Sequence, residues 1–265
     1  MNHFNKSIIV LHAHPDDTEA YSAGMLKQMA DQGYEITIVT LTAGGLGSMS
    51  GHRERTIEIR TKEAEKAAAV LNADYYCMGQ KDGYAYDDAE SRITFTNLIR
   101  KVKAGIVITH LPMDYHPDHR VACNIAEAAA MVSSLPNVPC DEPHLELTPL
   151  LYHSATIDLS DPLGGDLPEP HFYLDVTSVM NTRDEMLSHH QSQIELMKHM
   201  HKMDNFFELM KQYNEKLGEK IGVKYAEVYW QHLGGGFQKE PLIQSELYKY
   251  VHKNRVQHEP NGIKV

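Results

Sequence analysis

The segment SIIVLHAHPDD, residues 7–17, joins a short apolar run to a loop of histidine, proline and aspartate. The run is rich in β-branched residues and predicts a buried strand. Apolar residues at helical spacing follow over residues 18–32, and Gly33 ends this helix. The segment EITIVTLTAGG, residues 35–45, then predicts a second strand that ends in a glycine loop. The chain therefore begins as strand, loop, helix and strand.

The same alternation continues to residue 133. Strands are predicted over residues 73–79 and 105–111, and helices over residues 53–72, 91–104 and, after a loop, within 114–132. Apolar strands between amphipathic helices predict a Rossmann-like α/β fold. Its sheet is expected to be twisted and mostly parallel, with helices on both faces and right-handed crossovers.

After residue 133 the pattern weakens into loops rich in proline and glycine. Further strands are predicted over residues 150–156, 171–177 and 225–232, and mostly helical structure over residues 180–222. The sequence has no internal repeat and no low-complexity linker. We therefore interpret residues 1–265 as a single domain with a decorated C-terminal half and a tail that frays from about residue 254.

The bulk composition narrows the class of partner. A formal net charge of −11 argues against nucleic acid or an anionic membrane, because both favour a basic surface. The three cysteines include no CxxC pair, which argues against a disulfide framework and favours the reducing cytoplasm. No apolar stretch approaches the ~18 residues of a membrane span, and the first apolar run is too short for a signal peptide. We expect a cytoplasmic protein that acts on a small-molecule substrate.

A second stretch, HPDH at residues 116–119, repeats the theme of the first and also follows an apolar strand. In a doubly wound sheet the ligand site lies beyond the carboxyl ends of the strands, so the two stretches are expected to meet. Together they offer a two-histidine, one-carboxylate metal site with an acid and a base to spare. The residues are His14, Asp16 and Asp17 in the first stretch, and His116, Asp118 and His119 in the second.

Each of these residues alone has a simpler interpretation. An aspartate before a helix can cap its first turn, and a histidine in a loop can be an ordinary surface residue. The joint occurrence of two such stretches at two strand ends is what predicts a metal site.

The motifs AHPDDTE and HPDH resemble those of the LmbE-like, or PIG-L, family of zinc-dependent N-acetylglucosaminyl deacetylases. The segments IEIRTKEAEKAAAVLN, DYHPDHR, HHQSQ and VKYAEVYW are also similar to segments of that family, so the resemblance covers most of the chain. It implies removal of an acetyl group from an N-acetyl amino sugar of the N-acetylglucosamine type or from its conjugate. The motifs are specific for the family and not for the substrate.

The resemblance also implies a role for each motif residue. The zinc ligands would be His14, Asp17 and His119. Asp16 would act as general base toward a metal-activated water, and a protonated His116 would stabilise the oxyanion and assist proton delivery to the leaving amine. Asp118 would orient His116. The division of acid and base work between Asp16 and His116 stays open.

Two further residues are candidates for substrate binding. Arg60 matches the family's Arg-x-x-Glu helix and could reach substrate hydroxyls, or it could form a surface salt bridge with Glu63 or Glu58. His110 ends the strand before the second motif and is a candidate for lining the pocket. The chain departs from the family at Leu46, where relatives often have glutamate, and the effect of this change is open.

Other functions remain as alternatives. The same chemistry could act on an N-acyl amide that is not a sugar, and a metal-binding protein without turnover is a third possibility. Asp16 and His116 argue against the latter, because they are surplus for binding alone. Fe²⁺ or another divalent metal could replace zinc. The glycine-rich TAGGLGSMSG lacks the GxGxxG start of a nucleotide site. The substrate, acyl group, pathway, native metal and oligomeric state stay open, and a homo-oligomer would be consistent with the family.

Overall fold

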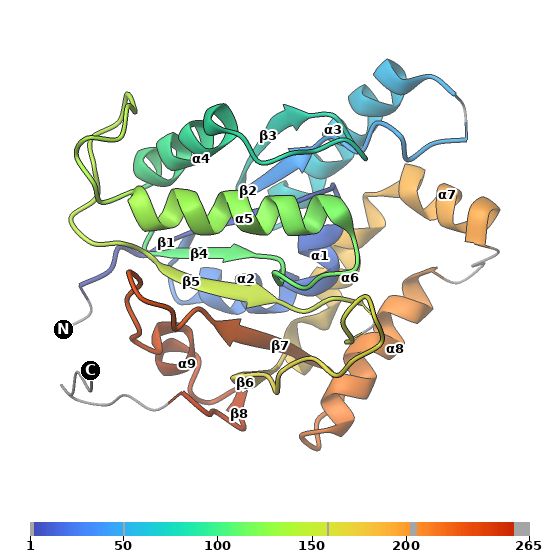
Figure 1. Ribbon diagram of the computed structural model, residues 1–265. Coiled ribbons are helices and arrows are strands. Elements are labelled where there is room, and N and C mark those ends of the chain that lie inside the picture. Colours follow the sequence, from blue (N-terminus) through green and yellow to red (C-terminus); the bar gives the residue numbers. More distant parts are fainter. Residues whose placement is uncertain (1–2, 50, 158, 202–205, 257–265) are drawn as a thin grey trace.

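The computed structural model describes residues 3–49, 51–157, 159–201 and 206–256. Within them a sheet of eight strands lies between two layers of helices (Figure 1). In chain order the elements are β1 (Ser7–His12), α1 (Asp17–Tyr21), α2 (Ala23–Asp31), β2 (Glu35–Thr42), α3 (Arg53–Ala69), β3 (Asp74–Gln80), α4 (Ala89–Lys101), β4 (Ile106–Thr109), α5 (Pro117–Val132), β5 (Leu150–Ser154), β6 (Phe172–Asp175), the 3₁₀ turn η1 (Thr177–Val179), α6 (Met180–Ser188), α7 (Gln191–His201), α8 (Phe206–Glu219), β7 (Ala226–Gln231), α9 (Leu242–Glu246) and β8 (Val251–His252).

The strands lie in the order β3-β2-β1-β4-β5-β7-β6-β8. The first five are parallel to one another, whereas β7 pairs antiparallel with β5 and β6, and β8 pairs antiparallel with β6. This arrangement confirms the predicted α/β fold with a mostly parallel sheet. The antiparallel pairings all involve strands from the weakly patterned C-terminal half.

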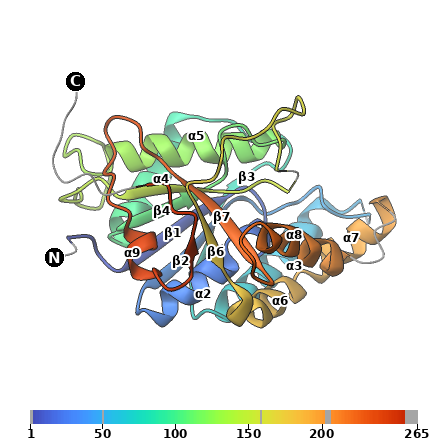
Figure 2. The ribbon, with the colours of Figure 1, turned by 90° about the horizontal axis from the view of Figure 1, so that it is seen from below.

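Helices cover both faces of the sheet, which explains why the central strands are apolar throughout. Ile8 and Val10 of β1 pack into a core with α2, α3 and α6, whereas Ile9 and Leu11 face α4 and α5. Figure 2 shows these two helix layers on opposite sides of the strands. A third apolar cluster packs α8 against β7.

The predicted helix over residues 18–32 is interrupted at Ser22, whose φ of −142° is not helical. The break divides it into α1 and α2. The carboxylate of Glu227, on β7, accepts hydrogen bonds from the backbone N–H groups of Gly24 and Met25 at 2.8 and 2.9 Å. A carboxylate is favourable at a helix N-terminus, so Glu227 supports a second helix start there. The sequence pattern could not show this, because the capping group lies about two hundred residues away.

Three expectations concern membrane-spanning segments, the C-terminal tail and the number of domains. None of the helices in the described residues is long and apolar enough to cross a membrane. Most of the tail expected to fray, residues 257–265, lies outside the described part of the chain. The interpretation as a single domain stays a prediction.

The position of the site follows from the strand order. β1 and β4 are parallel neighbours, with Leu11 opposite Thr109 near their carboxyl ends. From β1 the chain goes to β2 on one side, and from β4 it goes to β5 on the other side. The loops after β1 and β4 therefore lead to opposite faces of the sheet, and such a switch point is where sheets of this kind bind ligands.

Candidate metal centre

The first motif loop makes a sharp turn between β1 and α1. Asp16 has a φ of 102°, in the left-handed region that residues other than glycine rarely adopt. Such a conformation persists only where the surroundings hold it. The guanidinium of Arg60, on α3, provides a clamp: its Nη2 donates to the carbonyl oxygen of Pro15 at 2.8 Å and lies 3.6 Å from Asp16 Oδ1.

Arg60 is itself held by the loop after β2. Its Nη1 donates to the carbonyl oxygen of Gly44 at 3.2 Å, and the side chain is almost fully buried. A Cβ atom at Gly44 or Gly47 would lie 2.4 or 2.2 Å from Arg60 Nη1, so a side chain at either position would displace the guanidinium. A hydrogen bond or ion pair of Arg60 with Glu63 or Glu58 is not found among the described residues. Arg60 thus positions the loop, and its direct contact with substrate stays a prediction.

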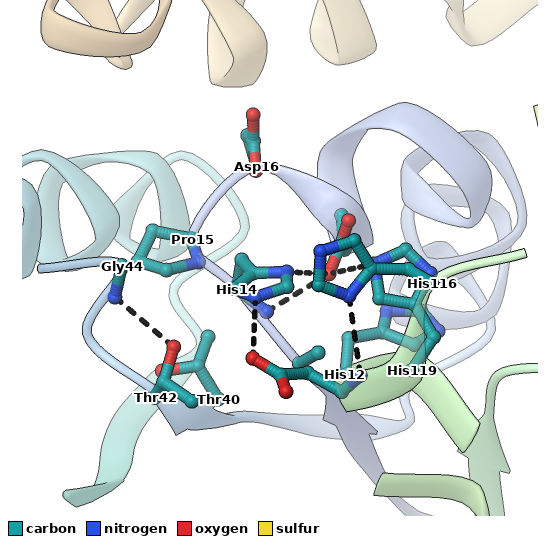
Figure 3. Close-up of polar contacts among 12 residues, drawn as sticks. His12, His14, Pro15, Asp16, Thr40, Thr42, Gly44, His116 and His119 are labelled. Carbon is teal, nitrogen blue, oxygen red and sulfur yellow. Dashed lines mark hydrogen bonds and ion pairs between the residues drawn. The ribbon is translucent and has the colours of Figure 1, made fainter. Parts of the chain in front are cut away.

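The three predicted zinc ligands converge on one carboxylate oxygen. Asp17 Oδ2 lies 3.4 Å from His14 Nδ1 and 3.4 Å from His119 Nε2. Ligand atoms around a tetrahedral zinc ion are about 3.3 Å apart, given bonds of about 2.0 Å. Figure 3 shows His14, His116 and His119 side by side, and one nitrogen from each lies within 4.8 Å of the others. This cluster has the spacing and donor types of a metal site.

The charge of Asp17 suits a metal ligand. Burial acts to raise the pKa of this carboxyl, but the surrounding histidines more than offset it and hold the pKa well below its ordinary value. His119, His110 and His14 are the histidines responsible. Asp17 is therefore a carboxylate at neutral pH.

Asp114 holds His119 from behind. Its Oδ1 lies 3.0 Å from His119 Nδ1, and the aspartate is fully buried. A carboxylate at Nδ1 leaves Nε2 free for a metal and fixes the ring orientation. Asp114 also accepts the backbone N–H of His116 at 3.0 Å, so one carboxylate shapes the whole second loop. No role was predicted for Asp114 from the sequence, although its place five residues before His119, across a proline turn, was an available signal.

His110 lies beneath the cluster. It has no exposed surface, its ring stacks on His119 with centroids 3.9 Å apart, and its Nε2 accepts the N–H of Ala13 at 2.9 Å. Burial, together with the charge of His119, holds the pKa of His110 well below its ordinary value, so the ring is neutral. In this conformation His110 contacts both His119 and Asp17, whose Oδ2 lies 3.4 Å from His110 Nε2, and its role in substrate binding stays a prediction.

The carboxylate of Asp118 contacts groups other than the His116 ring, which it was expected to orient. Its Oδ2 accepts the N–H of Gly83 at 2.7 Å and lies 3.3 Å from His14 Nε2. His116 instead caps α5, because its Nδ1 accepts the backbone N–H of Asp118 at 3.2 Å. The first helical turn directs the Asp118 carboxylate toward the loop after β3. The Asp118 carboxylate therefore contacts a predicted metal ligand, and Asp118 contacts His116, which it was expected to orient, through its backbone N–H.

Asp82, in the loop after β3, is a site residue that sequence reasoning missed. Its Oδ1 lies 3.3 Å from His14 Nε2, and its Oδ2 accepts the backbone N–H of Leu46 at 2.8 Å. Burial acts to lower the pKa of His14, but Asp118, Asp17 and Asp82 outweigh it and raise this pKa well above its ordinary value. So many carboxylates around one imidazole make the cluster attractive to a cation. Leu46 contributes through its backbone, whatever its side chain does.

Asp16, the predicted general base, lies apart from the ligands. Its side chain points away from the three histidines (Figure 3). Burial raises the pKa of its carboxyl to about 6, although Arg60 opposes the shift. Close by, His190 Nε2 lies 3.2 Å from Glu19, and Glu63 accepts hydrogen bonds from the N–H and hydroxyl of Ser192. These contacts tie the segment at the start of α7 to α1 and α3.

The comparisons with known proteins agree with this geometry. Residues 9–130, which include both motif loops, match the model of the PIG-L family, described as GlcNAc-PI de-N-acetylase. The chain is 25% identical over 241 residues to the diacetylchitobiose deacetylase of Thermococcus kodakarensis, covering 84% of this chain and 81% of that protein. It is 24% identical over 234 residues to a probable N-acetyl-α-D-glucosaminyl L-malate deacetylase 2 of Bacillus anthracis, covering 85% and 94%.

Among solved structures, the N,N′-diacetylchitobiose deacetylase of Pyrococcus horikoshii has a TM-score of 0.73 with this chain. The identity is 24%, over 86% of this chain and 84% of that one, so this likeness shows a shared fold. The chain thus resembles the PIG-L family over both motif loops, and its similarity to the two deacetylases extends through the C-terminal half.

Proposed function

We propose that the protein is a zinc-dependent N-deacetylase that acts on an N-acetylglucosamine-type amino sugar or its conjugate in the cytoplasm. One observation carries the proposal: His14 and His119, from two loops far apart in sequence, both lie 3.4 Å from Asp17 Oδ2. The names of the two relatives described above, a diacetylchitobiose deacetylase and a probable N-acetyl-α-D-glucosaminyl L-malate deacetylase, support the substrate class. The three free cysteines are consistent with a reducing compartment.

The donor set fits zinc. Two imidazoles and one carboxylate are the ligands of many catalytic zinc sites, and they leave a coordination position open. When bound, zinc supplies Lewis acidity, which polarises the substrate carbonyl and makes a bound water more acidic. Fe²⁺ suits a two-histidine, one-carboxylate set as well. Zinc is favoured because amide hydrolysis requires no change of oxidation state.

Asp16 is the proposed general base. A carboxylate with a pKa near 6 is mostly ionised at neutral pH and still a useful proton acceptor. To take a proton from the attacking water, its side chain turns from Arg60 toward the histidines. The hydrogen bond from Arg60 to the Pro15 carbonyl involves backbone on the acceptor side, so it does not depend on the orientation of the Asp16 side chain.

His116 is the proposed donor to the developing oxyanion. Because its Nδ1 accepts a backbone N–H, the proton of the neutral ring lies on Nε2. This Nε2–H can donate a hydrogen bond to the carbonyl oxygen as negative charge develops there. The geometry therefore supports this role for the neutral ring, and a protonated His116 is not needed for it. Asp118 assists by fixing the imidazole through its backbone.

The test is release of free amine from a panel of N-acetylated sugars, their conjugates and non-sugar N-acyl amides. Zinc-loaded wild type is compared with Asp16→Asn and with a surface control, Asp31→Asn. We expect turnover of an N-acetylglucosamine compound that falls by at least about 100-fold in Asp16→Asn, with zinc still bound, and is unchanged in the control.

Two results would contradict this proposal. Turnover of non-sugar amides alone would keep the chemistry and change the substrate class. No amine release from any compound by protein with a tightly bound metal would favour binding without catalysis.

A further inference from the structure

One face of α5 serves two separate groups of side chains. His119, Cys123 and Glu127 follow one another at intervals of one helical turn, so they lie in a row along the helix. His119 belongs to the metal centre described above. The other two face His153, on β5, and His232, directly after β7, and neither the mechanism nor the family motifs use any of these four residues. Figure 1 shows α5 lying across the sheet near β4 and β5.

The donor atoms of this second group have the spacing of metal ligands. His153 Nε2 lies 3.3 Å from His232 Nδ1 and 3.7 Å from Glu127 Oε1, and His232 Nδ1 lies 3.6 Å from that same oxygen. A point about 2.0 Å from all three atoms exists at the centre of this triangle, which is the length of zinc bonds to nitrogen and carboxylate oxygen. Cys123 Sγ adds a fourth donor, 3.6 Å from Glu127 Oε1.

His153 is already oriented as a ligand. Its Nδ1 lies 2.8 Å from the carbonyl oxygen of His110, which can only accept, so the ring proton is on Nδ1. The lone pair is then on Nε2, the atom that faces His232 and Glu127. Metal-binding histidines typically donate their other N–H to a backbone carbonyl in this way. Burial lowers the pKa of His153 to about 4, so the ring stays neutral at physiological pH.

The second group of side chains is buried on one side and accessible to solvent on the other. Cys123 and His153 are buried, whereas the side chains of Glu127 and His232 are 29% and 23% exposed. An ion could therefore enter past Glu127 and His232 and meet the thiol at the inner end. Burial raises the pKa of the Cys123 thiol well above its ordinary value, so without a cation it remains protonated. A bound metal would displace that proton.

We propose that Cys123, Glu127, His153 and His232 form a second metal site, for Zn²⁺ or a similar divalent cation. Four protein ligands close the coordination shell, which is the pattern of a structural site and not of a catalytic one. The ion would connect α5 to β5 and to the chain after β7, and so fasten the parallel half of the sheet to its antiparallel half. The competing account is a metal-free network in which His153 and His232 share hydrogen bonds with Glu127.

Metal counting distinguishes the two accounts. Full-length protein is saturated with zinc, freed of loosely held ions, and assayed for zinc per chain. We expect two equivalents in wild type, one in His14→Ala, which weakens the first centre, and one in His232→Ala, which weakens the second. Loss of a ligand should lower affinity by more than the roughly 10- to 100-fold found for supporting residues. The matched control is Cys140→Ala, since Cys140 lies outside the cluster.

Cobalt gives an independent readout. Co²⁺ added to metal-free wild type should produce a thiolate-to-cobalt charge-transfer band that is absent in Cys123→Ser and present in Cys140→Ala. His232→Ala changes a partly exposed side chain, so it serves as the deciding variant should a Cys123 variant unfold. A single equivalent of zinc in wild type that survives His232→Ala, a second equivalent that survives His232→Ala, or two equivalents of Co²⁺ without the thiolate band would overturn the proposal.

Discussion

The two His-Pro-Asp loops are similar in sequence but are held in place by different means. The loop after β1 contains the strained residue Asp16 and depends on Arg60, forty-four residues further along the chain. The loop after β4 is built locally: His116 has ordinary extended dihedrals, caps α5, and is followed by Pro117 at the first helical position. A first loop fixed by distant contacts should be more sensitive to remote substitutions than a second loop fixed by its own helix.

Arg60→Ala is expected to have the largest effect. It leaves the carbonyl groups of Pro15 and Gly44 without their buried donor and removes the partner of Asp16. Loss of one partner from such a buried group costs about 3–5 kcal/mol of unfolding free energy. Urea denaturation measures this loss of unfolding free energy. The control is Arg92→Ala, whose ion pair with Asp87 is exposed and is worth about 1 kcal/mol or less. Equal losses in the two variants would show that the clamp does not hold the loop.

Gly44→Ala tests the same clamp from its other side. Gly44 has a φ of +65° and no room for a Cβ beside Arg60, whereas Gly33 has a φ of +83° and open space around it. Both substitutions carry a backbone cost of about 1 kcal/mol, and Gly44→Ala should add about 1–3 kcal/mol from the clash. The difference in thermal stability between Gly44→Ala and Gly33→Ala isolates the contribution of the steric clash with Arg60. If Gly33→Ala were as destabilising as Gly44→Ala, contact with Arg60 would not be the cause.

Asp114→Asn addresses the second loop. The amide keeps an oxygen for the backbone N–H of His116 but loses the charge that supports His119. We expect metal affinity to fall about 10- to 100-fold with little change in folding stability, because the loop is fixed by its helix. Competition with a chelator gives the affinity, and circular dichroism gives the stability. A loss of folding without a loss of affinity would reverse the contrast between the loops.

Glu227→Gln should have the smallest effect, visible as a change in pH dependence. Burial raises the pKa of Glu227 in the folded chain, although Tyr229 and the N–H groups of Met25 and Gly24 oppose this. The folded state therefore holds the proton to higher pH than the unfolded state, so this contribution to stability is full below the ordinary glutamate pKa and declines as pH rises through the folded pKa. Glu227→Gln should flatten that decline in urea titrations from acid to neutral pH. An unchanged slope would show that Glu227 is not its source.

The sequence predicted the features that depend on local residue patterns and on the topology of a parallel sheet. Strand periodicity located the central strands, and the rule that ligands bind beyond their carboxyl ends brought the loops of His14 and His119 together. Contacts made by distant groups had no local signal. The break at Ser22 depends on Glu227, and the approach of Asp82 depends on how the loop after β3 folds. The family resemblance assigned Asp118 to His116, but the carboxylate of Asp118 lies beside His14.

Leu46 has a consequence for how this protein could change over evolution or in the laboratory. Its backbone N–H supports Asp82, while its side chain is 53% exposed at the rim of the centre. Any residue except proline supplies that N–H, so position 46 can vary in shape and charge while the centre keeps its architecture. A randomised library at this position should yield mostly folded variants, and the differences among them should appear in substrate preference. The loop after β2 is thus a place where new specificities can arise at little structural risk.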